Sequence, residues 1–200
     1  MNICLYGASS NAIAKSYINP TEELGAKLAD GGHTLIYGGG AAGLMGAAAR
    51  GAYSRGGKII GIVPSFLNVD VILFNNCDEM IYTETMRERK QLMEEKADAF
   101  IMTPGGVGTF DEFFEILTLK QLGRHTKPIA VFNINGYFYS LIEQLKNAVR
   151  EQFMTPESFS LCFFTDNADK LINYLEQSVE EPSQARVYKN LKALTLSLMN

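Results

Sequence analysis

Short apolar runs alternate with longer amphipathic stretches along the chain. The run Lys58–Val63 is apolar almost without interruption, which is typical of a strand buried on both faces. An alternation of strands and helices predicts a parallel sheet covered by helices. We therefore expect a doubly wound α/β fold with helices on both faces of the sheet. The predicted strands are Asn2–Tyr6, His33–Tyr37, Lys58–Val63, Ala99–Met102, Ile129–Asn133 and Leu161–Phe164.

The domain organisation follows from length and from the absence of a linker. The 200 residues fit one domain, and neither a fixed-period repeat nor a low-complexity segment divides them. We expect residues 1–180 to form a single domain. After a polar stretch at residues 180–183, apolar residues recur at helical spacing, which predicts that residues 181–200 form an amphipathic helix docked on this domain or on a partner subunit. These residues are Val187, Leu191, Leu194 and Leu198.

Composition and charge narrow the classes of partner. Eighteen basic against 22 acidic residues give a net charge of −4, which offers no general attraction for nucleic acid. Cys4, Cys77 and Cys162 lack the spacing of a metal site, and an odd, sparse set favours a reducing cytosol. No apolar run approaches the ~20 residues that span a membrane, and the N-terminus does not resemble a leader. We expect a cytoplasmic protein without a metal.

A first glycine-rich loop, Tyr37–Gly46, lies between a predicted strand and an alanine-rich helix. Glycines allow close approach of a ligand, and a helix N-terminus favours an anion, so Gly39, Gly40 and Gly43 are candidate phosphate contacts. The stretch also matches the dinucleotide pattern GxGxxG, but the next strand ends at Pro64-Ser65 without the carboxylate that would hold a ribose. A mononucleotide phosphate is therefore favoured over a dinucleotide.

A second glycine-rich loop, Thr103–Thr109, again follows an apolar strand and precedes a helix. Two such loops in a small parallel sheet should lie at adjacent strand ends, where open α/β sheets bind ligands. We expect both loops to line one crevice. The alternative is that both are tight turns that serve only to connect elements, but such turns need one glycine and not three.

The predicted helix after the second loop is apolar on two sides. Phe110, Phe113, Phe114 and Leu117 are expected to pack on the sheet. The opposite side needs a second cover, which predicts a homodimer. A carboxylate among these aliphatic groups would have a raised pKa, suited to proton transfer, and Glu112 is the one nearest the loop. The alternative is that Glu112 and Glu115 face solvent in the first turn of the helix and stabilise its dipole. This opposite side carries Glu112, Glu115, Ile116, Leu119 and Leu122.

Two cations flank an apolar stripe in the helix predicted before the strand Ala99–Met102. Met86, Met93 and Ala97 form the stripe, so that Arg89 and Lys90 point inward. A buried guanidinium needs an anion, so Arg89 should pair with a structural carboxylate or with a ligand. We favour a ligand, because the helix leads into the strand that carries the second glycine loop.

Several of these segments resemble one family. Pro104–Glu112 is similar to the PGGxGTxxE motif of the lonely-guy family, and Met86–Lys90 is similar to its MxxRK motif. Tyr37–Gly46 resembles the family's YGGGxxGLMG segment, and Cys4–Ser10 resembles its N-terminal strand and turn. The resemblance covers about residues 2–155, which is far more than short motifs match by chance.

The resemblance implies a Rossmann-like homodimer that hydrolyses N6-modified adenosine 5′-monophosphates to free base and ribose 5-phosphate, without a cofactor. It implies that Arg89 and Glu112 are catalytic. It implies that Lys90, the stretch 106–112 and Thr118 contact the substrate. Together with the glycine loops and their neighbours, the predicted substrate contacts are Ser9, Gly39, Gly40, Gly43, Lys90, Gly105, Gly106, Val107, Gly108, Thr109, Glu115 and Thr118. An older label of such sequences as lysine decarboxylases is not favoured, because that reaction normally needs pyridoxal on a lysine that nothing here marks.

The chain departs from the family pattern at two places. Gly7–Ser10 replaces a cysteine-glycine-serine-serine order, and Ser65–Val71 has no clear counterpart of a substrate-binding glutamate. The base preference therefore stays open, and plain AMP is an alternative substrate.

For the reaction, we expect Glu112 to orient water and stabilise the sugar cation, while Arg89 holds the phosphate or sugar and helps the base to leave. The glycine loops and the hydroxyl of Thr109 would hold the 5′-phosphate. The competing hypothesis is a carrier that holds a nucleotide or a molybdopterin-like phosphate without cleaving it. The presence of both Arg89 and Glu112 favours the hydrolase.

Overall fold

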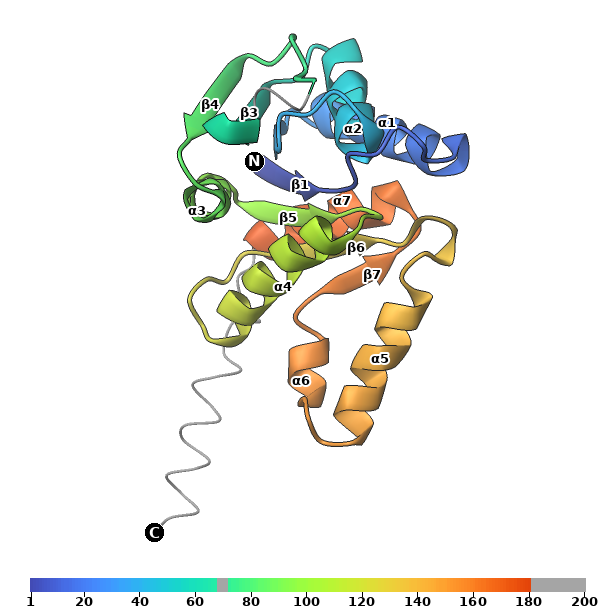
Figure 1. Cartoon of the computed structure of the whole chain (residues 1–200). Coiled ribbons are helices and arrows are strands. Elements are labelled where there is room, and N and C mark those ends of the chain that lie inside the picture. Colours follow the sequence, from blue (N-terminus) through green and yellow to red (C-terminus); the bar gives the residue numbers. More distant parts are fainter. Residues whose placement is uncertain (68–71, 181–200) are drawn as a thin grey trace.

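The computed structural model describes residues 1–67 and 72–180 of the chain. The seven strands within these described residues join one parallel sheet in the order β4-β3-β2-β1-β5-β6-β7 (Figure 1). The prediction of a doubly wound, Rossmann-like α/β fold is confirmed. The strands are β1 (Asn2–Tyr6), β2 (Thr34–Tyr37), β3 (Ile59–Pro64), β4 (Glu79–Thr83), β5 (Ala99–Met102), β6 (Ile129–Phe132) and β7 (Phe163–Thr165).

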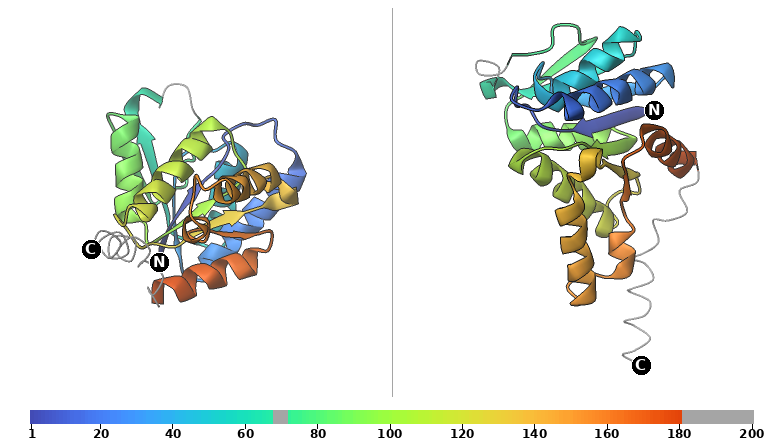
Figure 2. Two further views of the ribbon diagram at one scale, coloured as in Figure 1. Left: turned by 90° about the horizontal axis from the view of Figure 1, so that it is seen from below. Right: turned by 90° about the vertical axis from the view of Figure 1, so that its right-hand side faces the viewer.

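Helices cover both faces of the sheet, as Figure 2 shows. The helices α1, α2 and α7 pack on one face through a core that includes Leu24, Ala48 and Leu171. The helices α3 and α4 pack on the other face, where Met93 and Phe113 are fully buried. The helices are α1 (Lys15–Asp30), α2 (Gly43–Ser54), α3 (Met86–Lys96), α4 (Val107–Gln121), α5 (Tyr139–Arg150), α6 (Pro156–Phe159) and α7 (Ala168–Glu180), with short 3-10 turns η1 (Ser65–Leu67) and η2 (Ile134–Gly136).

The sequence pattern predicted the central strands and missed the edge strand β4. The central strands β3, β5 and β6 are buried at every position, which explains their uninterrupted apolar runs. At the edge, β4 pairs with β3 alone, and only Thr83 of its five residues is buried. A half-exposed strand does not need an apolar run, so this strand left no such signal.

Helix α4 differs from its expected orientation in one respect. Phe113 and Leu117 pack on the sheet as expected, but Phe114 is 40% exposed, so the prediction that it packs there is wrong. Glu112 and Ile116, expected on an open side, are buried within the chain because α3 borders that side of α4. The helix predicted for residues 181–200 lies outside the described residues.

Candidate active site

The carboxyl ends of β1 and β5 lie side by side at the point where the chain connections run in opposite directions. Strand β1 connects through α1 towards β2, whereas β5 connects through α4 towards β6. Ligands of open α/β sheets bind in the crevice that such a switch point creates. The two loops that leave these strands are joined by a hydrogen bond of 3.1 Å from the amide of Ala8 to the carbonyl of Pro104.

Arg89 of α3 and Glu112 of α4 meet above this crevice. Nη1 of Arg89 donates to Oε1 of Glu112 at 2.7 Å, and Nε donates to the carbonyl of Ile62 at 3.0 Å. The two residues are 7% and 8% exposed, so a charged pair is held almost out of water. The sequence left open whether Arg89 pairs with a carboxylate or a ligand. The structure shows a carboxylate, and it is the one that the motif marks as catalytic.

Burial dominates the electrostatics of this pair. Loss of solvent raises the pKa of the Glu112 carboxyl above its ordinary value, and the opposing attraction of Arg89 offsets this rise only in part. The neighbouring Asp111 adds to the rise through like-charge repulsion. A carboxylate with a raised pKa is a better proton acceptor than one in water, which suits it to activate a water molecule.

A cavity of about 450 Å³ opens in front of the pair. Six of the predicted site residues line it, namely Ser9, Arg89, Gly106, Gly108, Thr109 and Glu112. Asp111, which belongs to the predicted stretch 106–112, lines it as well. Met45, Leu67 and Met86 give the cavity an apolar side, and the sequence had placed only Met86 of these three in an apolar stripe. The remaining lining residues are Gly7, Ala8 and Ser10.

The second glycine loop ends in an uncapped helix N-terminus. Gly106 is the N-cap of α4, and no side chain accepts a hydrogen bond from the first turn. The first amides of a helix have no partner within the helix, so they are free to bind an anion. Gly106, Val107 and Gly108 are exposed, and Thr109 is buried below them.

The first glycine loop has a different environment. The amides of Leu44 and Met45, at the start of α2, donate to the carbonyl of Ala8 at 2.8 and 3.3 Å. Gly43 has a φ of +61°, and a side chain there would collide with the same carbonyl. These amides therefore contact protein, and Gly43 packs against the loop that follows β1.

The other predicted contacts of the first loop, Gly39 and Gly40, are buried and do not line the cavity. Gly39 packs against Val63, and Gly40 bridges to Leu73. The loop instead contributes Gly38, which sequence reasoning missed: a β-carbon at this position would collide with Nη2 of Arg89. The absent side chain gives the guanidinium its room.

Lys90 is engaged by two carboxylates of α4. Its Nζ lies 2.9 Å from Oδ2 of Asp111 and 2.6 Å from Oε2 of Glu115. Burial lowers the pKa of Lys90, but the hydrogen bonds from Glu115 and Asp111 outweigh this effect, so the net pKa is raised. Lys90, Glu115 and the exposed Thr118, all predicted substrate contacts, lie outside the cavity lining and join α3 to α4 or face outward.

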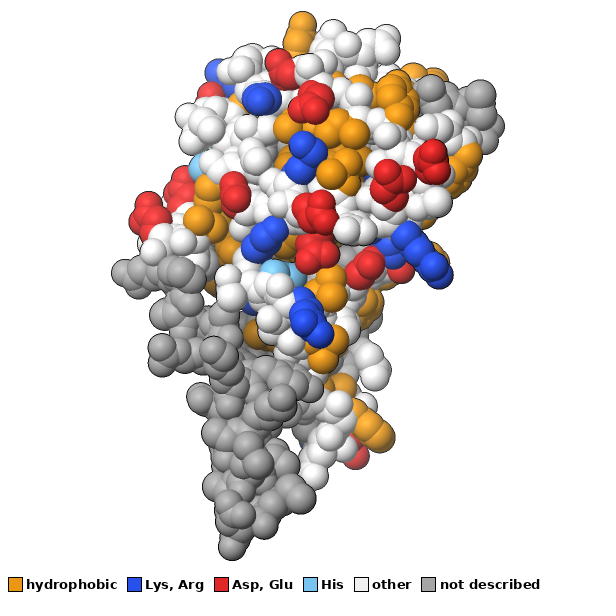
Figure 3. Space-filling model, turned by 90° about the vertical axis from the view of Figure 1, so that its left-hand side faces the viewer, with side chains coloured by type: hydrophobic (Ala, Val, Ile, Leu, Met, Phe, Trp, Pro, Cys, Tyr) orange, Lys and Arg blue, Asp and Glu red, His pale blue; other side chains and the backbone are white. Residues whose placement is uncertain are grey.

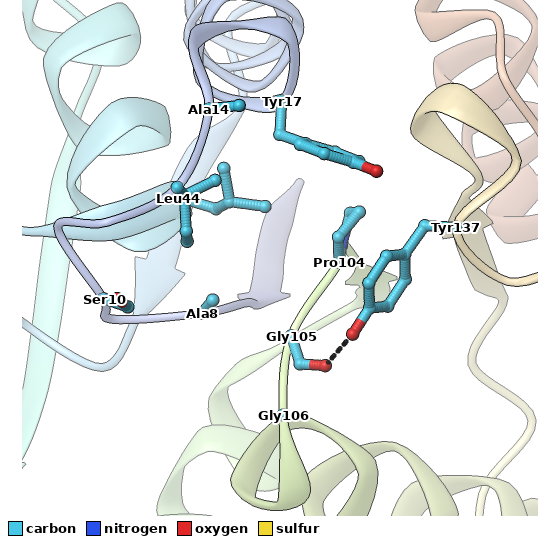
Figure 4. A pocket seen from close by; sticks show the side chains of 10 residues that line it. Ala8, Ser10, Ala14, Tyr17, Leu44, Pro104, Gly105, Gly106 and Tyr137 are labelled. Carbon is cyan, nitrogen blue, oxygen red and sulfur yellow. Dashed lines mark hydrogen bonds between the residues drawn. The ribbon is translucent and has the colours of Figure 1, made fainter.

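A second cavity, of about 330 Å³ and mostly apolar, is lined by Pro104, Gly105 and Gly106 of the second glycine loop (Figure 4). It shares Ala8, Ser10 and Gly106 with the first cavity. Tyr17 and Tyr137 form one wall, and the hydroxyl of Tyr137 donates to the carbonyl of Gly105 at 2.7 Å. Gly105, a predicted substrate contact, lines this cavity only. The two tyrosines had no signal in the sequence beyond their aromatic character.

Two absences concern the described part of the chain. Within residues 1–67 and 72–180, no group of three or more His, Cys, Asp or Glu side chains is arranged to bind a metal ion. In the same residues, no helix combines the length and the apolar character that crossing a membrane requires.

Fold and site together define a Rossmann-like α/β protein with a buried Arg–Glu pair beside an open helix N-terminus. Residues 45–175 match a family model described as "Possible lysine decarboxylase". The chain is 36% identical over 177 residues to the cytokinin riboside 5'-monophosphate phosphoribohydrolase LOG2 of Arabidopsis thaliana, covering 88% of this chain and 83% of that one. It is 34% identical over 187 residues to the probable phosphoribohydrolase LOGL5 of Oryza sativa subsp. japonica, covering 94% and 76%.

The chain therefore belongs to the lonely-guy (LOG) family, which confirms the resemblance seen in the sequence. Among solved structures, the molybdenum cofactor binding protein of Rippkaea orientalis is similar, with a TM-score of 0.69 over 89% of this chain and 96% of that one. Since the two chains are only 22% identical, this likeness concerns the fold.

Proposed function

We propose that the chain hydrolyses the N-glycosidic bond of adenosine 5′-monophosphates, including N6-modified ones, to free base and ribose 5-phosphate. The observation that carries this proposal is the buried Arg89–Glu112 pair, which lines the same cavity as the uncapped N-terminus of helix α4. The names of the curated relatives, cytokinin riboside 5'-monophosphate phosphoribohydrolases, support it.

The 5′-phosphate is assigned to the start of α4. The exposed amides of Gly106, Val107 and Gly108 offer donors and the positive end of the helix dipole. Thr109, which lines the cavity, adds a hydroxyl. Binding of the phosphate at a distance from the reacting bond fixes the position of the sugar, so that binding energy contributes to the rate.

The chemistry is assigned to the ion pair. Cleavage of an N-glycosidic bond builds positive charge on the ribose ring, which the Glu112 carboxylate stabilises. The hydrogen bond from Arg89 uses Oε1, and we assign Oε2 to the attacking water. The water oxygen bonds to C1′ as the C1′–N bond breaks, and the departing base takes up the proton that this water loses. The guanidinium of Arg89 stabilises the negative charge that develops on the base.

The apolar side of the cavity fits a purine. Met45, Leu67 and Met86 line it together with the catalytic pair, and thioether side chains adapt to flat rings of different substitution. No lysine is among the described residues that line this cavity, which disfavours the decarboxylase description of the family model.

Incubation of the pure protein with a panel of nucleoside 5′-monophosphates tests the proposal. Chromatography should show free adenine or its N6-isopentenyl derivative, with an equal amount of ribose 5-phosphate. Tight binding of a nucleotide without release of base would contradict hydrolysis and favour the alternative, a nucleotide or molybdenum-cofactor carrier.

We also propose a homodimer. Val107, Phe114 and Leu122 of α4 are 86%, 40% and 49% exposed, and their spacing places them along one side of the helix. An exposed apolar stripe on a helix is typical of a protein interface. Light scattering should give a mass of two chains for the parent protein and a smaller one for Phe114→Lys. A parent mass of one chain would contradict the proposal.

Nucleic acid is not a proposed partner. On the face that Figure 3 shows, basic side chains are interspersed with acidic ones, and the net charge is negative. The free cysteines Cys4, Cys77 and Cys162 are compatible with a reducing compartment, so we propose the cytoplasm as the location.

A further inference from the structure

The loop that begins α4 is held by hydrogen bonds to three successive carbonyl groups. The carbonyl of Pro104 accepts from the amide of Ala8 at 3.1 Å, and that of Gly106 accepts from the amide of Phe110 at 3.0 Å. The carbonyl of Gly105 lies between them and accepts from the hydroxyl of Tyr137 at 2.7 Å. The central bond is thus the one that depends on a side chain.

This central bond sets the direction of the next amide. The carbonyl of Gly105 and the N–H of Gly106 belong to one planar peptide unit, and no peptide bond of the described residues is cis. In a trans unit the two groups point in opposite directions. Tyr137, which lines the apolar cavity, donates to the carbonyl of Gly105 (Figure 4), so the N–H of Gly106 points away from this hydroxyl. Gly106 also lines the cavity of Arg89 and Glu112.

We propose that Tyr137 is a positioning residue that turns the Gly106 amide towards the phosphate of the substrate, an inference that rests on the proposed function. Consecutive glycines rotate freely, so without an external hydrogen bond the Gly105–Gly106 peptide unit would sample orientations that bind no anion. The hydroxyl of Tyr137 removes this freedom before the ligand arrives.

The tyrosine itself is well placed for this role. Its ring packs edge-to-face on Tyr17 and on Phe138, with centroid distances of 6.1 and 5.0 Å. The side chain of Asn133, which follows β6, accepts a hydrogen bond of 2.7 Å from the amide of Phe138 and so fixes the turn. Because the ring contacts do not involve the hydroxyl, Tyr137→Phe should keep the packing and lose only the bond to Gly105.

The test compares the parent protein with Tyr137→Phe and with Tyr139→Phe. Tyr139 is a matched control, because it lies two residues away and its ring is 67% exposed. Calorimetry gives the Kd of ribose 5-phosphate, and steady-state kinetics with AMP gives KM and kcat. Thermal unfolding checks that all three proteins are folded.

We expect Tyr137→Phe to raise the Kd of ribose 5-phosphate and the KM of AMP about five- to tenfold, the effect of about one hydrogen bond. The kcat should change less than about twofold, because the catalytic pair is untouched. Tyr139→Phe should match the parent. An unchanged Kd in Tyr137→Phe, or a fall in kcat at constant KM and Kd, would overturn the assignment.

The binding measurement keeps this inference separate from the proposed reaction. If the parent releases no base from AMP but the Kd of ribose 5-phosphate still rises in Tyr137→Phe, the hydrolase proposal fails and the positioning role stands. If AMP is hydrolysed and Tyr137→Phe binds ribose 5-phosphate like the parent, the positioning role fails alone. A parent that neither binds ribose 5-phosphate nor releases base from AMP contradicts both, and one that hydrolyses AMP without binding ribose 5-phosphate contradicts the positioning role.

Discussion

The two glycine-rich loops are alike in sequence, but they differ in what binds the first amides of the helix that follows each loop. At the start of α2, the carbonyl of Ala8 accepts from the amides of Leu44 and Met45, so these two amides are already bound within the protein. At the start of α4, no side chain caps the first turn, and the exposed residues Gly106 and Gly108 line a cavity. Glycine marks close approach of a backbone in both loops, but only the second leaves donors for a ligand.

Substitutions in the two glycine-rich loops should have different consequences. In the first loop, glycines allow the chain to pack, and Gly38 gives room to Arg89. In the second loop, they expose amides next to the catalytic pair. A substitution at Gly43 of the first loop should therefore appear in folding, and a substitution in the second loop in ligand affinity and turnover.

The largest expected effect is the loss of turnover in Glu112→Gln, which keeps the shape of the side chain and removes its negative charge. We expect kcat for AMP to fall about 10²–10⁴-fold, the usual contribution of a positioned acid or base. Steady-state kinetics measures this, with Glu143→Gln on the exposed side of α5 as control. Full turnover in Glu112→Gln would remove Glu112 from the mechanism.

The pH profile of the parent gives a second view of this carboxylate. Water activation needs ionised Glu112, whose folded-state pKa is raised by burial. Activity should therefore be full above this raised pKa and fall as the pH drops through it, with a midpoint above the ordinary 4.5. A midpoint of kcat/KM at or below that value would show that the titrating group is not a buried carboxyl.

The next largest effect is expected in the first glycine-rich loop. Gly43→Ala places a methyl group against the carbonyl of Ala8 at a φ of +61°. Backbone strain and overpacking should lower the free energy of unfolding by about 3 kcal/mol. Urea unfolding measures the loss, and the remaining folded protein should bind ribose 5-phosphate like the parent. A stable variant with weakened binding would mean that this loop contacts the ligand after all.

A smaller effect is expected in the second glycine-rich loop. A β-carbon on Gly106 would have no atom within 4 Å, so Gly106→Ala should leave stability nearly unchanged, within about 0.5 kcal/mol. The added methyl group should obstruct the phosphate and raise the Kd of ribose 5-phosphate about tenfold. Calorimetry decides between this result and parent-like affinity, which would place the phosphate elsewhere.

The smallest effect is expected at Lys90. Two carboxylates already neutralise its ammonium group, so Lys90→Met should raise the KM of AMP less than about threefold and cost about 1 kcal/mol of stability at most. Kinetics and unfolding measure the two quantities. A KM raised by a factor of ten or more would instead support the direct substrate contact that the family resemblance implies.

The sequence predicted those features that depend on local pattern. Uninterrupted apolar runs located the buried strands, and helical periodicity placed Arg89 on the inward side of its helix. The same periodicity placed Glu112 on the side away from the sheet, whereas the structure buries it against α3. The meeting of these two side chains depends on how α3 lies against α4, which no local pattern contains. The family motifs alone connected them before the structure was known.

The features that could not be predicted depend on contacts between distant segments. The carbonyl that accepts from the amides at the start of α2 belongs to Ala8, which is far from Leu44 in sequence. The two glycine-rich loops were therefore equivalent in the sequence pattern. Phe114 follows the buried Phe113 on the same helix but lies at the exposed border of the apolar side. Tyr137 reaches the second loop from the turn after β6, and its role depends on a single hydroxyl group.

We infer that the substrate phosphate binds at the start of α4 and not at the start of α2. Amide resonances recorded during a titration with ribose 5-phosphate distinguish the two sites. We expect large shifts for Gly106, Val107 and Gly108, with Leu44 and Met45 nearly unchanged. Large shifts of Leu44 and Met45, with the α4 amides unmoved, would contradict this inference.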